Sequence, residues 1–305
     1  MPLISYIICT YNRALYLKKA LDALAHQNYS DFNDFEVVII NNNSTDKTQQ
    51  VVDTFIQQYS NIQVIYANEQ KQGLSNARNK AIEVSNAEWL AFLDDDAYVD
   101  ADYTFNLINF IKSNTDIKAI GGPILLDFES PKPNWYTHYL GSLFGYFKPY
   151  KKSRLFTKNF YPRGSNMIFH RSLFQKYGRF NPNLGRIGRN MMGSEEKDMF
   201  QRIYKNHEKV YYLHTAVIYH LVPDFRTETD FIKKQSIGVG RSEHVRIMQS
   251  HTGVFSKIIS ELFKWGVSFL LFVFYSLQFK PAKGIMLIRF RYWVLQGLTT
   301  KIEKL

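Results

Sequence analysis

The chain has 305 residues, and its apolar content of 45% is enough for a substantial core and excludes a disordered chain. A single cysteine, Cys9, excludes an internal disulfide and a zinc site built from several cysteines, and it is typical of a reducing compartment. The net charge of +11, from 38 Lys and Arg and 27 Asp and Glu, predicts anionic partners: phosphates, nucleic acid or an anionic membrane surface.

The positive charge is concentrated in two segments. Residues 233–305 contain 12 Lys or Arg and 3 Asp or Glu, so they carry +9 of the total. Residues 148–163 contain six basic residues and no acid. The first apolar run alternates like a core strand and does not resemble a signal peptide, so we expect a cytoplasmic protein.

Strand and helix patterns alternate through the first 125 residues. Apolar, β-branched runs predict strands, and apolar residues at helical spacing predict the helices between them. The predicted strands are 3–10, 36–40, 62–66 and 89–93, and the predicted helices are 14–25, 51–59, 76–84 with Ser75 as cap, and 102–113. Such repeated units predict an α/β fold, a mostly parallel, Rossmann-like sheet with helices on both faces.

The second part of the chain has a different character. Residues 121–190 are rich in aromatic side chains and irregular, with turns at several prolines. A helix is predicted over 195–207, and short strands are predicted over 210–213 and 217–220.

Polar motifs follow three of the predicted strands. They are T-Y-N-R (10–13), N-N-N-S-T-D (41–46) and D-D-D (94–96). Ligands of a parallel α/β sheet bind beyond the carboxyl ends of its strands. We therefore expect all three motifs to face one edge of the sheet.

The acidic triplet Asp94, Asp95 and Asp96 is the strongest chemical signal. Adjacent carboxylates repel one another and are costly in a cleft unless a cation neutralises them. Alternatively, Asp96 and Asp100 favour the N-terminus of the helix that follows. The position at the ligand edge favours a metal site, because Mg²⁺ takes one or two carboxylates together with phosphate oxygens. A nucleotide diphosphate on that metal is then expected, with one Asp on the metal and another on the ribose.

Several motifs in order resemble the inverting glycosyltransferases of family 2, which have the GT-A fold. The resemblance covers residues 3 to 245, and its motifs are S-Y-I-I-C-T-Y-N-R, I-I-N-N-N-S-T-D, G-L-S-N-A-R-N, F-L-D-D-D, G-S-N-M (164–167), F-N-P-N-L-G-R (180–186) and G-S-E-E-K-D (193–198). It implies a nucleotide-sugar-binding half in residues 1–125 and an acceptor-binding, catalytic half in residues 126–250. A helical tail follows in residues 251–305.

The resemblance implies roles for the residues of the ligand edge. Asn41 stands where the family often has an Asp that contacts the base, so the nucleotide stays open, with a UDP-sugar as first expectation. Arg78 reaches toward the nucleotide, or is simply a surface arginine of its helix. Asp94 or Asp95 holds the ribose and Asp96 binds Mg²⁺ or Mn²⁺. The base pocket is lined by Thr10, Tyr11 and Arg13.

Inverting transfer needs a carboxylate that takes the proton of the acceptor hydroxyl. The family places it in an E-D pair at the start of a helix, and this chain has Glu195 and Glu196 there. Glu196 is the predicted base and Glu195 the alternate. The competing interpretation is that acids in a first helical turn complement the helix dipole, which explains Asp198 better than Glu196.

Further residues are assigned by the same resemblance. His220 is a predicted metal ligand beside Asp96, with a structural histidine as the alternative. Trp135 and Tyr136 could stack on an acceptor sugar or simply be core. Asn166, in G-S-N-M, is also assigned to acceptor binding. The glycine- and arginine-rich segment 178–193 is a candidate lid over the diphosphate, or a plain surface loop.

The tail contains fifteen residues without charge, 265–279, fewer than the roughly 20 that a membrane-spanning helix needs. The basic residues that flank this run predict a helix lying on an anionic membrane surface. A buried helix on the domain or in a dimer is the alternative. The family's acceptors are often lipid-linked glycans, which fits a peripheral protein on the inner face of the cell membrane. The flanking basic residues are Lys257, Lys264, Lys280, Lys283, Arg289 and Arg291.

The leading hypothesis is therefore a metal-dependent inverting glycosyltransferase that acts on a glycan or lipid-linked glycan. A nucleotidyltransferase-like enzyme would share the strand-end carboxylates, and a non-catalytic, membrane-associated protein could keep the fold. Nucleic acid is not expected as a partner, because the basic residues lie beside a long apolar segment rather than on a nucleic-acid module.

Overall fold

The computed structural model describes residues 1–157, 160–186, 195–250 and 254–299, with the backbone alone for 245–250 and 254–259. It divides into two compact units: Met1–Leu125 with Phe147–Leu221, and Leu126–Tyr146 with Val222–Leu305. The first break falls at the predicted boundary after residue 125, but the chain returns to the first unit at Phe147. The functional division into 1–125, 126–250 and 251–305 stays a prediction.

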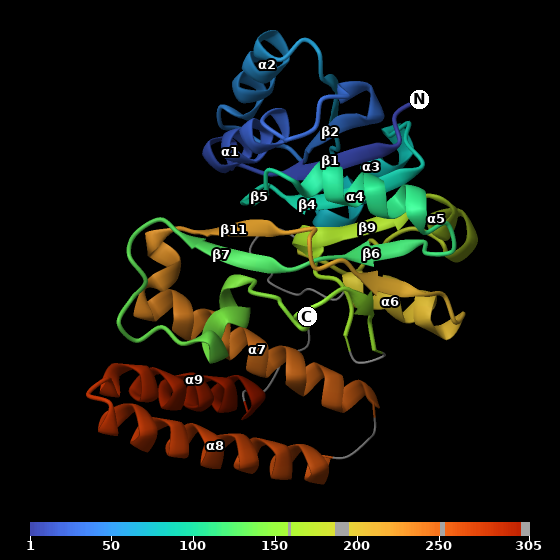
Figure 1. Cartoon of the computed structure of the whole chain (residues 1–305). Helices are drawn as coiled ribbons and strands as arrows, with labels where there is room; N and C mark the ends of the chain where they lie inside the picture. The colour runs from blue at the N-terminus through green and yellow to red at the C-terminus, as the bar shows by residue number, and fades with distance from the viewer. Residues whose placement is uncertain (158–159, 187–194, 251–253, 300–305) are drawn as a thin grey trace. The chain divides into compact units, whose positions relative to one another are not determined.

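The first unit is built on an eight-stranded sheet (Figure 1). Its strands are β1 (Ile4–Thr10), β2 (Phe35–Asn41), β3 (Gln63–Asn68), β4 (Trp89–Asp94), β6 (Ala119–Gly121), β8 (Arg154–Leu155), β9 (Met167–His170) and β10 (Val210–Tyr212). Their order is β3-β2-β1-β4-β9-β6-β10-β8. Only β9 and β8 are antiparallel to their neighbours, so the prediction of a mostly parallel sheet is confirmed.

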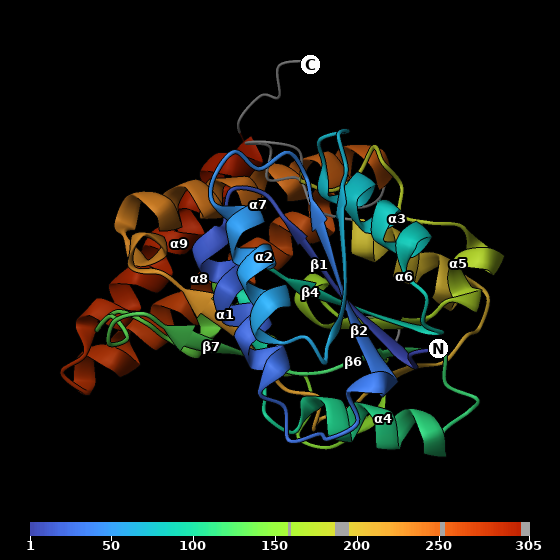
Figure 2. The same cartoon turned by 90° about the horizontal axis from the view of Figure 1, so that it is seen from above.

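Helices cover both faces of this sheet. They are α1 (Ala14–Ala25), α2 (Thr48–Gln58), α3 (Leu74–Val84), α4 (Tyr103–Ser113), α5 (Ser172–Tyr177) and α6 (Glu195–Lys205), with 3-10 turns η1 (Phe32–Asp34) and η3 (Gly164–Asn166). The chain steps from β1 to β2 to β3 in one direction and then returns past β1 to β4. Because such crossovers are right-handed, α1 and α2 lie on one face and α3 on the other, as Figure 2 shows.

The reversal of direction between β1 and β4 positions the site. An α/β sheet opens a crevice where its strand order reverses, beyond the carboxyl ends of the strands. Thr10 ends β1, and Asp94 ends β4 opposite Cys9 of β1. The motifs that follow these strands therefore meet at the crevice.

The central strands are buried because most of their residues are apolar on both faces. Every residue of β2 is buried, as is all of β1 except Cys9, whereas β3 at the sheet edge is only partly covered. This is the burial expected of a parallel sheet between helices. One predicted cap is wrong: α3 begins after Gly73, and the hydroxyl of Ser75 donates to the carbonyl of Leu184 at 2.6 Å.

A three-stranded sheet holds the residues that follow the acidic triplet. Its strands, in the order β5-β11-β7, are β5 (Ala97–Val99), β11 (Ile218–Val222) and β7 (Ile124–Phe128). Antiparallel pairing places His220 opposite Ala97, and the Leu221 N–H donates to the Asp96 carbonyl at 2.8 Å. The sequence predicted His220 at the end of its strand. In the structure it lies in the middle of β11.

The second unit is helical. Its elements are η2 (His138–Phe144), η4 (Asp224–Thr227), α7 (Thr229–Ser250), α8 (Val254–Leu277) and α9 (Pro281–Thr299). Within this unit α9 lies between α7 and α8 (Figure 1). Glycines allow the close approach, because a Cβ on Gly240 of α7 would lie 2.1 Å from the Val294 carbonyl oxygen of α9.

The predicted uncharged run is part of a longer helix. The 24 residues of α8 include Glu261 and Lys264, which form an ion pair of 2.6 Å one turn apart. Among the described residues, α8 is the one helix long and apolar enough to cross a membrane by length and composition alone. The expectation of a helix too short to span is corrected, because it counted only the uncharged residues.

Candidate active site

The acidic triplet lies at the crevice of the first unit. Asp94 closes β4 with its side chain 32% exposed, whereas Asp95 and Asp96 are buried. Thr10 Oγ1, at the end of β1, donates to Asp95 Oδ2 at 2.9 Å. The structure therefore brings the T-Y-N-R and D-D-D motifs together, as the sequence predicted.

Arg13 supplies a positive charge to this cluster. Its Nη1 lies 3.2 Å from Asp95 Oδ1 and 2.5 Å from Asp96 Oδ2. Burial raises the pKa of Asp95 to about 7, Arg13 opposes this rise, and the charge of Asp96 adds to it. The protein thus offsets part of the repulsion with its own arginine. These ion pairs do not test whether Arg13 lines the base pocket, so that role stays a prediction.

Asp94, Asp96 and His220 form a group that could hold a metal ion. Their three ligand atoms lie within 4.8 Å of one another. His220 Nε2 is 3.2 Å from Asp96 Oδ1, and its buried Nδ1 has no hydrogen-bond partner within the described structure. Two carboxylate oxygens suit Mg²⁺ or Mn²⁺, and the imidazole nitrogen favours Mn²⁺, since Mg²⁺ prefers oxygen. The donor set therefore fits the predicted metal.

A buried arginine links the triplet to the glutamate pair. Arg78 Nη1 lies 2.7 Å from Glu195 Oε1, and its Nη2 lies 3.6 Å from Asp94 Oδ1. The side chains of Arg78 and Glu195 are each 3% exposed. The interpretation of Arg78 as a surface arginine is therefore wrong, and its contact with a nucleotide stays a prediction.

Glu196 is held by the backbone of η3. Its Oε1 accepts the Gly164 N–H at 3.0 Å, and a Cβ on Gly164 would lie 2.7 Å from that oxygen. A larger residue at position 164 would therefore displace the Glu196 carboxylate from its present place. Burial, followed by the charge of Glu195, raises the pKa of Glu196 to about 7. A carboxyl with such a pKa is suited to accept a proton near neutrality.

Ser165 is a site residue that the sequence reasoning missed. Its Oγ donates to Asp94 Oδ2 at 2.5 Å, so η3 contacts Glu196 through Gly164 and Asp94 through Ser165. Within the G-S-N-M motif the sequence predicts a role for Asn166 and none for Ser165. Asn166 is fully buried, donates to the carbonyls of Pro123 and Ala216, and accepts from the Tyr103 hydroxyl. These are core contacts, and the acceptor role of Asn166 stays a prediction without support here.

The remaining predicted residues lie in different surroundings. Tyr11 is exposed and directly follows Thr10, the last residue of β1. The amide of Asn41 donates to the Tyr66 hydroxyl at 2.9 Å, and its oxygen accepts the Ser44 N–H at 2.8 Å. Tyr66, which sequence reasoning also missed, thus stands beside the predicted base contact.

Trp135 and Tyr136 belong to the second unit, where both pack against Phe144. The acidic triplet and the glutamate pair belong to the first unit. The predicted lid, 178–193, falls partly on residues 187–194, which lie outside the described ranges. Both roles stay predictions.

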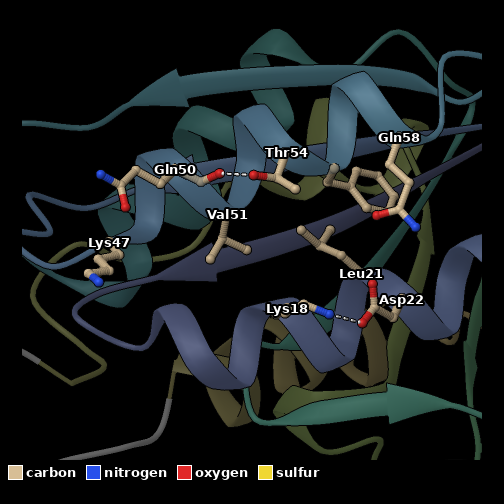
Figure 3. Close-up of a pocket in the computed structure, with 9 residues that line it drawn as sticks. Lys18, Leu21, Asp22, Lys47, Gln50, Val51, Thr54 and Gln58 are labelled. Atoms are coloured by element: carbon tan, nitrogen blue, oxygen red, sulfur yellow. Dashed lines mark hydrogen bonds and ion pairs between the residues drawn. The ribbon is translucent and has the colours of Figure 1, made fainter.

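A groove between α1 and α2 is separate from this site (Figure 3). The Lys18–Asp22 ion pair lies on one side, and the Thr54 hydroxyl donates to the Gln50 carbonyl on the other. None of the lining residues is a carboxylate of the triplet or the glutamate pair. It is a gap between two amphipathic helices, and the candidate active site is instead the place where the charged side chains converge.

Solved structures identify the fold of the chain as the GT-A fold. The mannosyltransferase PcManGT of Pyrobaculum calidifontis, solved with GDP-Man and Mn²⁺, matches with a TM-score of 0.63 at 15% identity, over 97% of this chain and 86% of that one. Residues 1–349 of S. aureus TarS, solved with UDP-GlcNAc, match with a TM-score of 0.56 at 18% identity, over 99% and 94%. These likenesses establish the GT-A fold.

Sequence comparison then gives the family. The family model for glycosyl transferase family 2 matches residues 5–178, so the chain belongs to this family. It is 27% identical over 248 residues to the glucosyl-dolichyl phosphate glucuronosyltransferase of Haloferax volcanii, covering 79% of this chain and 76% of that protein. It is 33% identical over 96 residues to the GalNAc(5)-diNAcBac-PP-undecaprenol beta-1,3-glucosyltransferase of Campylobacter jejuni, covering 32% and 30%. The resemblance seen in the sequence motifs is confirmed.

Proposed function

We propose that this family 2 glycosyltransferase moves a sugar, with inversion, from a nucleoside diphosphate sugar to a hydroxyl of a glycan or lipid-linked glycan. The observation that carries the proposal is the pairing of two acid groups across η3. A possible metal group, Asp94, Asp96 and His220, lies on one side, and Glu196 lies on the other. Arg78 contacts Asp94 and Glu195 and fixes the two groups relative to each other.

The residues of the triplet would bind the donor. Asp96 and His220, with Asp94 within reach, would hold a divalent cation, and such an ion would offset the charge of the departing diphosphate. Asp95, buried and paired with Arg13, or Asp94 would hydrogen-bond the ribose. The UDP and GDP sugars bound by the structural neighbours make these the donors to test first.

Glu196 would act on the acceptor. It takes the proton of the acceptor hydroxyl as that oxygen bonds to the anomeric carbon, and the bond from this carbon to the diphosphate oxygen breaks. The nucleoside diphosphate leaves on the opposite face, so the configuration inverts. The raised pKa of Glu196 makes it a stronger base than an exposed glutamate and leaves it about half ionised at neutral pH.

The acceptor class is proposed from two relatives. One is named for a dolichyl phosphate substrate and the other for an undecaprenol diphosphate substrate. Lipid-linked acceptors require a protein at a membrane surface, and α8 offers exposed apolar side chains for it: Leu262, Phe263, Phe269, Leu270, Phe274 and Leu277. We place the protein on the cytoplasmic face, with α8 in contact with an anionic bilayer.

A donor screen and one substitution test the chemistry. UDP- and GDP-sugars are ranked by thermal shift with Mn²⁺, Mg²⁺ or neither, because a ligand of the folded state raises its stability. With the donor so identified, Glu196→Gln should lower kcat by about 10² to 10⁴-fold while the Mn²⁺-dependent shift persists. Unchanged turnover in this variant, or a product of retained configuration, would refute the mechanism.

Vesicle flotation tests the membrane contact. Leu270→Glu with Phe274→Glu should abolish flotation of the full chain with phosphatidylglycerol vesicles, because both side chains are exposed on α8. The matched control is Leu15→Glu with Phe105→Glu, two exposed apolar residues of α1 and α4. Equal flotation of the α8 variant and the wild type would remove α8 from the contact.

A further inference from the structure

A long segment before the glutamate pair carries only positive charge. Between Glu129 and Glu195 the sequence has 12 Lys or Arg and no Asp or Glu. In the first unit, Lys148, Lys151, Lys152 and Arg154 of this segment are exposed. Among the described residues, no ion pair involves these four or Arg163. We call these five residues the basic surface.

The basic surface is held in place by the sheet. β8 pairs antiparallel with β10, and the Phe156 N–H donates to the Val210 carbonyl at 2.8 Å. Ser153 and His214 are hydrogen-bonded at 2.7 Å through their side chains. Little conformational freedom of this backbone remains to be lost when a ligand binds.

Aromatic rings connect the ends of the basic surface. The Arg154 guanidinium lies 4.9 Å from the ring centre of Tyr150. At the other end, the Arg163 guanidinium lies 5.2 Å from Phe147 and 4.5 Å from Tyr161. Between them, and onward to α6, the ring contacts run Tyr150–Phe156, Phe156–Phe147 and Tyr161–Phe200.

Arg163 is the member of the basic surface that lies next to the proposed base, Glu196. It directly precedes Gly164, whose N–H binds Glu196. Its charge also opposes the rise in the pKa of Glu196, as expected of a nearby cation. Arg163 leads through η3 into β9, and the other end of the basic surface lies at β8, three strands from β9 in the sheet order. At the usual strand spacing this is about 14 Å, a length that suits an extended chain rather than one diphosphate.

We propose that the basic surface binds the acceptor glycan through negatively charged groups, phosphates or carboxylates, carried along its chain. The inference rests on the proposed function, because that function requires the acceptor hydroxyl to reach Glu196 and so sets which end of the bound chain lies there. An anionic chain fits better than a bilayer, because the rings of this segment mostly pack on one another. Among the described residues of 148–163, the exposed large apolar side chains are Leu155 and Phe160, fewer than those described on α8.

Charge-removal variants of the full chain test the proposal. Lys151→Gln, Lys152→Gln and Arg154→Gln are combined, and the matched control combines Lys18→Gln, Lys112→Gln and Lys209→Gln, which lose only surface ion pairs. The probes are a short poly(ribitol phosphate) chain and a neutral dextran oligosaccharide of equal length. We expect about tenfold weaker binding of the phosphate chain by the first variant and less than about twofold by the control.

The outcomes separate this proposal from its alternatives. Equal losses in both variants, unchanged binding by the first variant, or equal affinity of the wild type for the two probes overturns it. Loss of flotation with phosphatidylglycerol vesicles in the first variant, with phosphate-chain binding retained, also overturns it in favour of a bilayer contact. The Mn²⁺-dependent thermal shift with UDP should be the same in all three proteins. Absence of any nucleotide shift would refute the proposed function while chain binding still stood.

Arg163→Gln sharpens the assignment next to the base. It should raise the KM for an anionic acceptor several-fold and leave the KM for the sugar nucleotide unchanged. A rise in the donor KM alone would assign Arg163 to the diphosphate and remove it from the basic surface.

Discussion

The Asp94–Asp96 triplet and the Glu195–Glu196 pair are both crowded carboxylates, yet the protein neutralises them differently. Arg13 contacts two acids of the triplet with its side chain 33% exposed, so solvent and ions share in the neutralisation. Arg78 is buried and contacts Glu195, whereas Glu196 receives the Gly164 N–H. Under the proposed mechanism, the triplet would bind a charged ligand and the pair would leave one carboxyl available for a proton.

Replacing the buried arginine should have the largest effect on stability. Arg78→Met leaves Glu195 with a buried carboxylate, whose Oε2 already lacks a hydrogen-bond partner in the described structure. Breaking a buried ion pair in this way destabilises a protein by about 3–5 kcal/mol. Urea unfolding of the apo protein, followed by circular dichroism, measures the change.

The matched control for Arg78→Met is the same substitution at Arg13, the arginine of the triplet. Arg13→Met should destabilise the protein less, because the Arg13 side chain is 33% exposed and water can reach its place beside Asp95 and Asp96. Mn²⁺ should restore part of the loss by replacing the missing cation. Mn²⁺ should not restore Arg78→Met. Equal rescue of both variants, or of neither, would mean that the two acid groups do not differ in the way inferred here.

The catalytic activity should depend on pH through the ionisation of Glu196. The pKa of Glu196 is raised from 4.5 to about 7, and a base acts only when ionised. Therefore kcat/KM should be constant above about pH 7 and fall about tenfold per unit below it. Initial rates with the donor found by thermal shift, at constant ionic strength, measure the profile.

Glu195→Gln identifies the group that titrates. The charge of Glu195 raises the pKa of Glu196, and Arg78, freed of its partner, lowers it further. The midpoint of the profile should therefore move to lower pH in this variant. An unmoved midpoint would assign the titration to another group, of which Asp95, also raised to about 7, is the first to consider.

The fold was predictable because its signals are local. The strands β1, β2 and β4 are apolar runs long enough to be buried, and helix 14–25 was placed to the residue. The sequence also predicted that Thr10 lies close to the triplet, because the carboxyl ends of parallel strands face the same edge of the sheet. The length of α8 was missed because Glu261 and Lys264 neutralise each other within the helix, which a count of uncharged residues does not detect.

The site was predictable only in part. Carboxylates at the end of a strand can be recognised from the sequence. The residues that form ion pairs and hydrogen bonds with them come from distant segments. Arg78 meets Glu195 across 117 positions and Ser165 meets Asp94 across 71. No spacing in the sequence encodes such contacts. Arg13 was assigned to a base pocket because its motif resembled one, and its two ion pairs became visible only with the tertiary structure.

Ser165→Ala makes the smallest predicted change and tests the link between the two acid groups. The variant removes the hydroxyl that donates to Asp94 Oδ2, and water can replace it because the Asp94 side chain is partly exposed. The loss of stability should be about 1 kcal/mol. If Asp94 binds the donor, the KM for the sugar nucleotide should rise several-fold while kcat stays nearly constant, since Gly164 still holds Glu196. The matched control is Ser172→Ala, whose hydroxyl contacts His170 at 2.7 Å and should leave both constants unchanged. A fall in kcat with an unchanged KM would instead mean that η3 acts on the base side, and that the triplet and the pair work as one unit.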